Sequence, residues 1–517
     1  MDINAELEKA LEENFDEKVE EKLNVKKGIY VDEKDIAALK EKYKGAVGII
    51  NKHVKYWCEY YTKKPFKERE KRIYLQDLKD QIILINGDYK EEEVASVSSE
   101  KERREIDEDV EDNEIMGADE ILKAAQKITG KEKIELLDVH KVYKKWLKVS
   151  DDKRIDLGLA VALTREIKGT KLWLWIIGTS GDWKTEQINA IHDNETTRIL
   201  RSITKNTLIS GYKGAKDLAP ELKDKLLLIP EGAQILTINK DDKNAVFAQL
   251  RDLYDGYAGA DKGSGTRAKY KDLNVSMIAG CTPFIDGQQL IHQQLGTREL
   301  FYRTSKGDII SDEELMDKVE ENADYEIEMR HELRMVTCAF INTHEYDNIK
   351  PGAETKKKIR NLVNYVRLMR ASAEIDFGTG ELRAEVFPEK PTRIYKQFLL
   401  LFSALKSLTP GYSDDKVLLL LEHISKSCAS QNRVKTLNHL IKMKVPQTTN
   451  NIHTRLKLGY KTIYTELNIL WNMGIINRNE CDADTGYGVK PVREWEIIRS
   501  NQLIKAMLNK ENLLFQK

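Results

Sequence analysis

The alternation of apolar and polar positions along this chain predicts a mixed α/β core. Three short apolar runs, at residues 172–177, 225–229 and 275–279, have the length of buried strands. A strand that is apolar at every position is typical of a parallel sheet, because helices cover both of its faces. Helical spacing separates the three runs, so we expect a parallel sheet with flanking helices between about residues 118 and 304.

A helical pattern follows the sheet region. Apolar residues recur every three or four positions at 362–369 and 398–405, which predicts amphipathic helices between about residues 311 and 425. No internal repeat is visible in the sequence. No run of residues approaches the 18 apolar positions that a membrane-spanning helix needs, so we expect no membrane partner.

The C-terminal residues 426–517 predict a winged-helix domain. The segment 448–476 has the spacing of a helix, a turn and a second helix, followed by a strand. Gly459 falls at the turn, where a positive φ is often required and favours glycine. A polar segment at 482–488 then separates two strand-like stretches, as the wing of such a domain would.

The N-terminal part of the chain is less informative. Residues 1–89 predict a mostly helical region whose role the sequence does not indicate. The acidic start of this region lacks the features of a secretion signal. Residues 90–120 hold 14 acidic and 4 basic residues and no aromatic side chain. This composition predicts a solvated acidic linker.

The composition narrows the class of protein. Hydrophobic residues make up 41% of the chain and charged residues 33%, as in an unusually ionic globular protein. The five cysteines form no CxxC pair, which argues against a disulfide framework or a structural zinc site and favours the cytoplasm. The nine histidines are scattered without HExxH, and neither GxSxG nor a paired-carboxylate nuclease cluster occurs. Metalloprotease, serine-hydrolase and nuclease chemistry are therefore disfavoured.

The near balance of 84 basic and 85 acidic residues hides segments of opposite charge. The total of −1 argues against a uniformly basic nucleic-acid coat, but residues 430–478 hold eight basic residues and one acid. A phosphate backbone responds to charge within a Debye length of about 8–10 Å. We therefore predict that the winged helix binds duplex DNA, with a protein-contact module as the alternative. The residues expected to contact DNA are Arg455, Lys457, Lys461, Thr462 and Tyr464.

A phosphate-binding loop is predicted directly after the first strand, before a helix. Its glycines let backbone N–H groups face phosphates, and the helix N-terminus adds positive potential. We expect Lys184 to reach the terminal phosphates of a nucleotide and the Thr185 hydroxyl to bind Mg²⁺. The alternative is an ordinary strand-to-helix turn with an incidental lysine. The loop comprises Gly178, Thr179, Ser180, Gly181, Asp182, Trp183, Lys184 and Thr185.

Two features depart from the common pattern of such loops. The pattern GxxxxGK[ST] has glycine where this chain has Trp183. The second strand ends in Pro230-Glu231, which supplies one acid where two are usual. We expect Glu231 to lie beside the loop, where it would bind the metal and polarise water, because the carboxyl ends of parallel strands share one edge. A surface glutamate is the alternative.

The order of these motifs resembles a family of P-loop ATPases encoded by phages, prophages and other mobile elements. More distantly, the layout is similar to the AAA+ module of minichromosome-maintenance helicases. The resemblance implies an AAA+ ATPase core at 121–310, a helical lid at 311–425, and ATP and Mg²⁺ as cofactors. The matching segments, between Val139 and Thr304, are GTSGDWKTE, NTLISGYKG, LLLIPEGAQIL, LRDLYDGYAG, IAGCTPFID and LGTRELFYR.

The resemblance also implies roles for single residues. Thr282 in AGCTP would be the polar sensor of the γ-phosphate. Arg298 in LGTRELFYR would be an arginine finger that acts on the nucleotide of a neighbouring subunit, with Arg303 as the nearby competitor. Arg393 would be a second sensor, carried by the lid. The alternatives are strand-end capping for Thr282 and ordinary surface positions for the arginines.

A hairpin is predicted between residues 254 and 270, where Gly, Ala, Ser and Asp are flanked by extended segments. In related ring helicases a hairpin at this place projects a lysine into the central pore. The resemblance therefore implies contacts of Lys262, Arg267 and Lys269 with single-stranded DNA. A charged solvent loop is the alternative.

Together these features predict an ATP-hydrolysing homo-oligomer, a hexameric ring that acts on DNA as a replicative helicase-like motor of a virus or mobile element, in the host cytoplasm. Two alternatives remain open at this point. One is an AAA+ regulator or remodeller that binds DNA without translocation. The other is a degenerate P-loop protein that serves as a DNA-binding scaffold.

Overall fold

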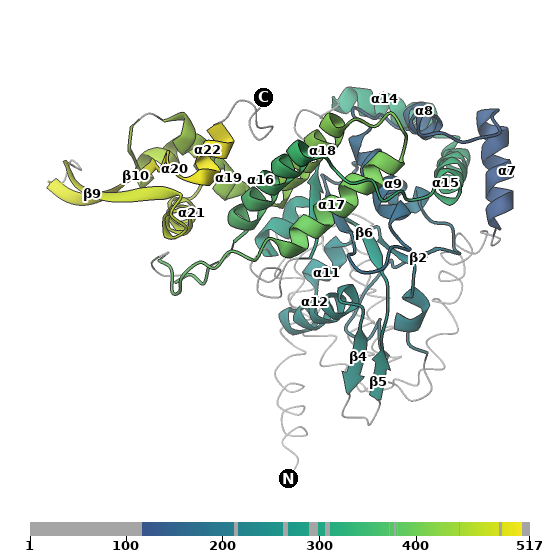
Figure 1. The fold of residues 1–517 in the computed structure, drawn as a ribbon, viewed down its shortest axis with the longest axis horizontal. Coiled ribbons are helices and arrows are strands. Elements are labelled where there is room, and N and C mark those ends of the chain that lie inside the picture. The colour runs from purple at the N-terminus through teal and green to yellow at the C-terminus, as the bar shows by residue number, and fades with distance from the viewer. Residues whose placement is uncertain are drawn as a thin grey trace, which may run out of the picture. The chain divides into compact units, whose positions relative to one another are not determined.

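A computed structural model describes most of the chain from residue 116 onward (Figure 1). These residues belong to one compact unit, 115–517. The helical region predicted at 1–89 and the predicted linker before residue 116 lie outside the described residues. The described ranges are 116–210, 216–261, 267–288, 298–304, 311–371, 373–376, 379, 381–443, 445–484 and 489–508.

A parallel five-stranded sheet in the order β2-β3-β6-β1-β7 lies at the centre of the described part. The three predicted apolar runs form its inner strands: β1 (Trp173–Ile177), β3 (Leu226–Ile229) and β6 (Ser276–Cys281). Every residue of these strands is buried, as their continuous apolar sequence requires. The edges are β2 (Thr197–Ile199) and β7 (Leu300–Arg303). The predicted parallel α/β sheet is confirmed.

Helices cover both faces of this sheet (Figure 1). Helix α9 (Lys153–Leu163) lies against β6 and is buried on almost every side, and α10 (Lys184–Ala190) follows β1 directly. The remaining helices of this part include α7 (Ala118–Thr129), α8 (Leu136–Trp146), α11 (Ala233–Thr237), α12 (Lys240–Tyr254) and the 3₁₀ turns η2 (Ala219–Leu222) and η3 (Pro283–Gln288).

The first described helix corrects one predicted boundary. The acidic linker was expected to extend to residue 120, but α7 begins at Ala118. The Glu120 carboxylate accepts a hydrogen bond from the Gly117 N–H at 3.1 Å, so an acidic residue assigned to the linker caps the helix. Acidic residues in a first helical turn also interact favourably with the helix dipole.

The region predicted as a lid, residues 311–425, is helical as expected. Helix α15 (Glu326–Thr343) packs against α7, α8 and α10, whereas α17 (Thr392–Ser407) packs against α9. One hydrophobic cluster runs through these helices and the sheet, so they share the core of the sheet region. The other helices are α14 (Asp312–Asn322), α16 (Ala353–Met369) and α18 (Asp414–Cys428).

The predicted hairpin is also present. Strands β4 (Ala258–Asp261) and β5 (Arg267–Tyr270) form an antiparallel ladder that extends away from the helices α16–α18 (Figure 1). The tip between them lies outside the described residues. The Tyr270 hydroxyl donates a hydrogen bond to Asp217 Oδ2 at 2.8 Å and so fixes the base of the hairpin.

The C-terminal part combines helices with a three-stranded antiparallel sheet in the order β8-β10-β9. The predicted helix-turn-helix and the two following strands are present, and the predicted boundary at 426 falls in the last turn of α18. The elements are α19 (Gln431–Lys442), β8 (Gln447–Thr448), α20 (Thr449–Leu456), α21 (Tyr460–Asn472), β9 (Ile476–Asp484), β10 (Val489–Ile497) and α22 (Gln502–Leu508).

The turn between α20 and α21 differs from the expectation. Gly459 has φ −54° and is the N-cap of α21, whereas Lys457, at the C-cap of α20, has the positive φ of 53°. The prediction that Gly459 supplies a left-handed residue was therefore wrong. A left-handed lysine is uncommon, and the short α20–α21 connection places it there.

The buried Arg433 joins the C-terminal part to the end of the preceding helix α16. Arg433 on α19 donates to Glu466 Oε2 at 2.7 Å and to the carbonyls of Met369 and Ala371 at 3.0 and 2.7 Å. These carbonyls lie in the last turn of α16 and just after it, where backbone acceptors lack partners within the helix. The only acid of residues 430–478 is thus used internally, while other basic residues of the segment stay exposed.

The side chains of α18 cover the outer edge of β7. Cys428 Sγ accepts from the Phe301 N–H at 3.2 Å, Ser427 Oγ accepts from the Arg303 N–H at 3.1 Å, and the His423 ring hydrogen-bonds to the Arg303 carbonyl at 2.6 Å. An edge strand otherwise presents unpaired backbone groups. Here helix side chains satisfy these groups in place of a further strand.

We predict that Ser427→Ala lowers the free energy of unfolding by about 1–3 kcal/mol, because the partly buried Arg303 N–H loses its acceptor. Denaturant unfolding measures the effect. The matched control is Ser425→Ala on the same helix, because among the described residues the Ser425 hydroxyl bonds only to the Leu421 carbonyl of its own helix. Equal losses in both variants would contradict a specific role of Ser427 at the strand edge.

His192, just beyond α10, makes the stability depend on pH. Its ring hydrogen-bonds to Thr197 Oγ1 at 2.6 Å, and burial, followed by the charge of Arg334, lowers its pKa from 6.5 to about 4. The folded state therefore disfavours the protonated ring. The contribution of neutral His192 to stability is complete above about pH 6.5 and is lost as the pH falls towards 4.

We predict that His192→Gln flattens the dependence of the unfolding free energy on pH between about 6.5 and 4. The difference from wild type across this window is at most about 3 kcal/mol. Urea unfolding at several pH values measures it, and the exposed His331→Gln is the control. Parallel curves for wild type and His192→Gln would refute the assignment.

Candidate nucleotide-binding site

The predicted phosphate loop lies at the carboxyl edge of the sheet, between the end of β1 and the start of α10 at Lys184. Gly181 has φ 81°, a left-handed conformation that glycine adopts without steric cost. The loop borders a cavity of about 250 Å³, which is slightly below the usual range for drug-sized ligands and suits a phosphate group. The cavity is lined by Ser180, Gly181, Asp182, Trp183, Lys184, Thr185, Glu186, Pro230, Glu231, Gly280, Cys281 and Thr282.

Lys184 is folded back onto its own loop. Its side chain is buried, and its ammonium group donates to the carbonyls of Gly178 and Thr179 at 3.2 and 2.5 Å. Burial lowers the pKa of Lys184, and the charge of Asp182 partly offsets this shift. The hydrogen-bond partners of this ammonium group within the described residues are backbone carbonyls, which it can exchange for stronger anionic acceptors such as phosphate oxygens.

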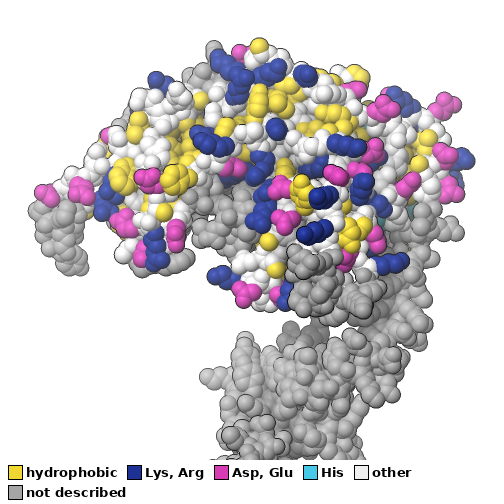
Figure 2. Space-filling model, turned by 60° about the horizontal axis from the view of Figure 1, so that its bottom comes forward, with side chains coloured by type: hydrophobic (Ala, Val, Ile, Leu, Met, Phe, Trp, Pro, Cys, Tyr) yellow, Lys and Arg dark blue, Asp and Glu magenta, His cyan; other side chains and the backbone are white. Residues whose placement is uncertain are grey.

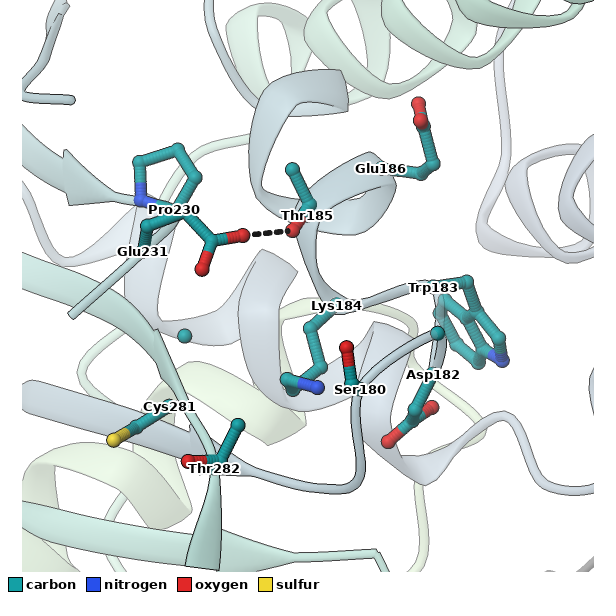
Figure 3. A pocket seen from close by; sticks show the side chains of 12 residues that line it. Ser180, Asp182, Trp183, Lys184, Thr185, Glu186, Pro230, Glu231, Cys281 and Thr282 are labelled. Atoms are coloured by element: carbon teal, nitrogen blue, oxygen red, sulfur yellow. Dashed lines mark hydrogen bonds between the residues drawn. The ribbon is translucent and has the colours of Figure 1, made fainter. Parts of the chain in front are cut away.

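Thr185, in the first turn of α10, and Glu231, just after β3, meet across the cavity. The Thr185 hydroxyl donates to Glu231 Oε1 at 3.1 Å (Figure 3). This arrangement brings a hydroxyl and a carboxylate oxygen to one point, as predicted from the loop and from the end of β3. Mg²⁺ prefers oxygen ligands and usually binds one or two protein groups together with water and substrate phosphates. The pair therefore fits a magnesium ion.

A close approach of β3 and β6 fixes the position of Glu231. The next residue, Gly232, donates its N–H to the Gly280 carbonyl at 2.7 Å. A Cβ atom at Gly232 would lie 2.8 Å from that oxygen and 2.9 Å from the Trp175 ring. Only glycine allows this approach, so Glu231 follows a rigidly placed turn.

Thr282 lies between the loop and the acid, because β6 separates β1 from β3 in the sheet. In Figure 3 Lys184 points towards the Thr282 side of the cavity, whereas Thr185 faces Glu231. The adjacent Cys281 is a buried free thiol, and burial raises its pKa to about 11. Cys281 is therefore a thiol rather than a thiolate at neutral pH and is unsuited to nucleophilic chemistry.

The bulky Trp183 is accommodated by a residue that the sequence analysis did not identify. Arg154 on α9 donates to Asp182 Oδ1 at 2.6 Å, and its guanidinium carbon lies 3.3 Å from the centroid of the Trp183 ring. Tyr143 contacts the same ring edge-on, with centroids 6.1 Å apart. A lone arginine in the apolar helix 153–163 was the available signal, but nothing in the sequence connected it to the loop.

Arg298 lies far from the phosphate loop of its own chain. It comes two residues before β7, whose Leu300 pairs with Leu174, so it is level with the amino end of β1. Only 8% of Arg298 is exposed, and its guanidinium binds Asp255 through Nη2 at 2.6 Å and Nε at 3.3 Å. Arg298 does not line the cavity of its own chain.

Arg393 and Arg303 occupy different ends of the sheet. Arg393 is in the first turn of α17, 4.0 Å from Glu389, and its charge acts on Tyr254 near Arg298. It does not line the cavity either. Arg303 ends β7 on the side of the loop, where it binds both carboxylate oxygens of Asp286 at 2.9 and 2.5 Å.

The residues predicted for the DNA hairpin are only partly described. Lys269 on β5 is exposed. Lys262 lies outside the described residues, and for Arg267 only the backbone, paired with Asp261, is described. The structure therefore supplies the strands of the hairpin but not its tip.

The predicted DNA-contact residues of α20 and α21 separate into two groups. Arg455, Lys457, Lys461 and Thr462 are exposed. Tyr464 is 9% exposed, donates its hydroxyl hydrogen bond to Glu381 and lies edge-on to Trp495. Tyr464 therefore belongs to the packing of α21, and its expected place at a DNA groove is corrected. Helical periodicity explains the difference, because Tyr464 follows Ile463 on the inner face of α21.

Charge over the described surface is mixed. Figure 2 shows Lys and Arg side chains interleaved with Asp and Glu over one face of the protein. Among the described residues, no group of three or more His, Cys, Asp and Glu side chains could hold a metal ion. A metal at Thr185 and Glu231 would thus depend on phosphate and water for its other ligands. No described helix has the length and apolar character needed to cross a membrane.

The sequence matches no protein-family model and no curated protein.

Proposed function

We propose that this protein is an ATP-hydrolysing, oligomeric AAA+ motor that acts on DNA, similar in role to the replicative helicases of viruses and mobile elements. One observation carries the proposal. Lys184 and Thr185 from the loop, Glu231 from β3 and Thr282 from β6 line one cavity at the carboxyl edge of the sheet. These are the groups that phosphate binding and hydrolysis require.

In this proposal each of the four side chains has a separate task. Lys184 would exchange its carbonyl partners for the terminal phosphates of ATP, and Thr185 with Glu231 would hold Mg²⁺. When bound, the metal neutralises charge on the phosphate oxygens. Glu231 would also orient the attacking water, and Thr282 would contact the γ-phosphate from the strand between them.

The position of Arg298 supports an oligomer. About six residues of extended chain, roughly 20 Å, separate the amino end of β1 from the phosphate loop. Arg298 is therefore too far from the nucleotide of its own chain, and as an arginine finger it would act on the nucleotide of a second copy. A homo-oligomeric ring, for which we propose six subunits, would bring the two together. Arg298 would then leave Asp255, which immediately precedes the β4–β5 hairpin.

DNA binding is proposed for two surfaces. The order of helices and strands at 431–497 supports a winged helix with exposed cations on α20 and α21. The hairpin carries the exposed Lys269, which suits contact with a single strand in a pore.

A second candidate is a DNA-binding regulator that hydrolyses ATP without translocation. The ion pair between Arg298 and Asp255 favours it, because the predicted finger is engaged within its own chain. Unwinding of a forked substrate separates the two candidates. A motor unwinds the fork in the presence of ATP, whereas the regulator binds duplex DNA and leaves the fork paired.

We predict that Lys184→Ala lowers ATP turnover by at least about a hundredfold, because the phosphates lose their principal cationic partner. Phosphate release by purified protein, with and without DNA, measures the change. The exposed Lys240→Ala is the matched control and should turn over ATP as wild type does. Wild-type turnover by Lys184→Ala would remove the basis of the proposal.

We predict that Lys457→Ala with Lys461→Ala weakens duplex DNA binding and reduces the slope of log K against log salt by about 2, since each lysine neutralises one phosphate. The control pair is Lys435→Ala with Lys442→Ala, exposed lysines on α19. Fluorescence anisotropy at several salt concentrations measures both. If the α19 pair changes the slope and the α20–α21 pair does not, the proposed DNA surface is misplaced.

A further inference from the structure

Arg154 is held rigidly next to the phosphate loop. Residues 154–163 of α9 are all buried, and a Cβ atom at Gly158 would lie 2.8 Å from the side-chain nitrogen of Gln187 on α10. The same nitrogen donates to the Arg154 carbonyl at 2.7 Å. The two helices are thus in contact at two points, and the Arg154 guanidinium has a fixed position relative to the start of α10.

The guanidinium of Arg154 neutralises an acid inside the loop. Arg154 is 3% exposed and donates to Asp182, which lies two residues before Lys184. Arg154 Nε and Nη2 and Asp182 Oδ2 are buried and make no hydrogen bond within the described residues. A buried ion pair with unsatisfied atoms is a poor source of stability. The position of the pair, inside the loop, points to a role in the loop itself.

The same guanidinium determines where Trp183 lies. It stacks on the indole at 3.3 Å, and Figure 3 shows the Trp183 ring turned away from Lys184 and Thr282. A large side chain directly before the phosphate-binding lysine would otherwise compete with the phosphates for space. Arginine is suited to this double contact because its planar group both stacks and pairs with a carboxylate.

We propose that Arg154, Asp182 and Trp183 form a clamp that keeps the loop open for phosphate, so that Arg154 is a positioning residue for nucleotide binding. The clamp replaces the glycine that commonly precedes the loop lysine. It does so by drawing the indole aside and by cancelling a negative charge that would repel the triphosphate. This inference rests on the proposed function, because it concerns the same nucleotide site.

Charge variants separate this role from simple packing. Arg154→Ala leaves Asp182 unpaired next to the phosphates, so ATP binding should weaken at least about tenfold, and ADP binding less because ADP carries less charge. Asp182→Asn leaves the positive charge of Arg154 unpaired next to the phosphates, so ATP binding should strengthen. A packing role would instead weaken ATP and ADP equally in both variants.

The experiment measures dissociation constants of ATP and ADP for the full chain by isothermal titration. The double variant Arg154→Ala with Asp182→Asn should recover most of the ATP affinity, and Arg154→Lys should recover part, because lysine pairs without stacking. Lys153→Ala, a neighbouring cation whose side chain is 43% exposed, is the control and should match wild type.

The outcomes distinguish the clamp from the wider proposal. If Arg154→Ala binds ATP and ADP as tightly as the wild type does, the clamp is overturned and the ATPase proposal still stands. Equal losses of ATP and ADP in Arg154→Ala and Asp182→Asn would also overturn it. Failure of the wild-type chain to bind either nucleotide would overturn the proposed function and the clamp together. If Arg154→Ala does not fold, the increase in ATP affinity expected for Asp182→Asn still tests the clamp.

Discussion

The parallel pairing of β1, β6 and β3 is the constraint on which the candidate site depends. Parallel strands end at the same edge, so the loop after β1, Glu231 after β3 and Thr282 after β6 meet, although Gly178 and Thr282 are 104 residues apart in the sequence. The contact of Gly232 with Gly280 holds two of these ends together. The site follows from the sheet rather than from any local motif alone.

Local sequence patterns were sufficient to predict most of the strands and helices. The continuous apolar runs gave the inner strands, and helical spacing gave α16, α17 and the α20–α21 pair, because burial on one or two faces leaves a periodic signal. The loop residues and Glu231 could be assigned because each follows such a strand directly. The expected face of Tyr464 and the turn at Gly459 were wrong, since both depend on how α20 and α21 pack.

Contacts between distant segments could not be predicted in the same way. Arg154 reaches a loop 28 residues away, and Ser427 reaches a strand 124 residues away. Neither contact leaves a periodicity or a motif in the sequence. The packing of α15 and α17 against the sheet region could not be predicted either. The apolar face of an amphipathic helix indicates that this face is covered, but not which element covers it.

The covered edge of β7 has a consequence for assembly. The hydrogen bonds from Phe301, Arg303 and His423 leave no backbone row on that side to which another chain could add a strand. Two copies of this protein therefore cannot join into a continuous sheet through β7. Any association on that side must be made by side chains, so its geometry can change without breaking a shared β-ladder.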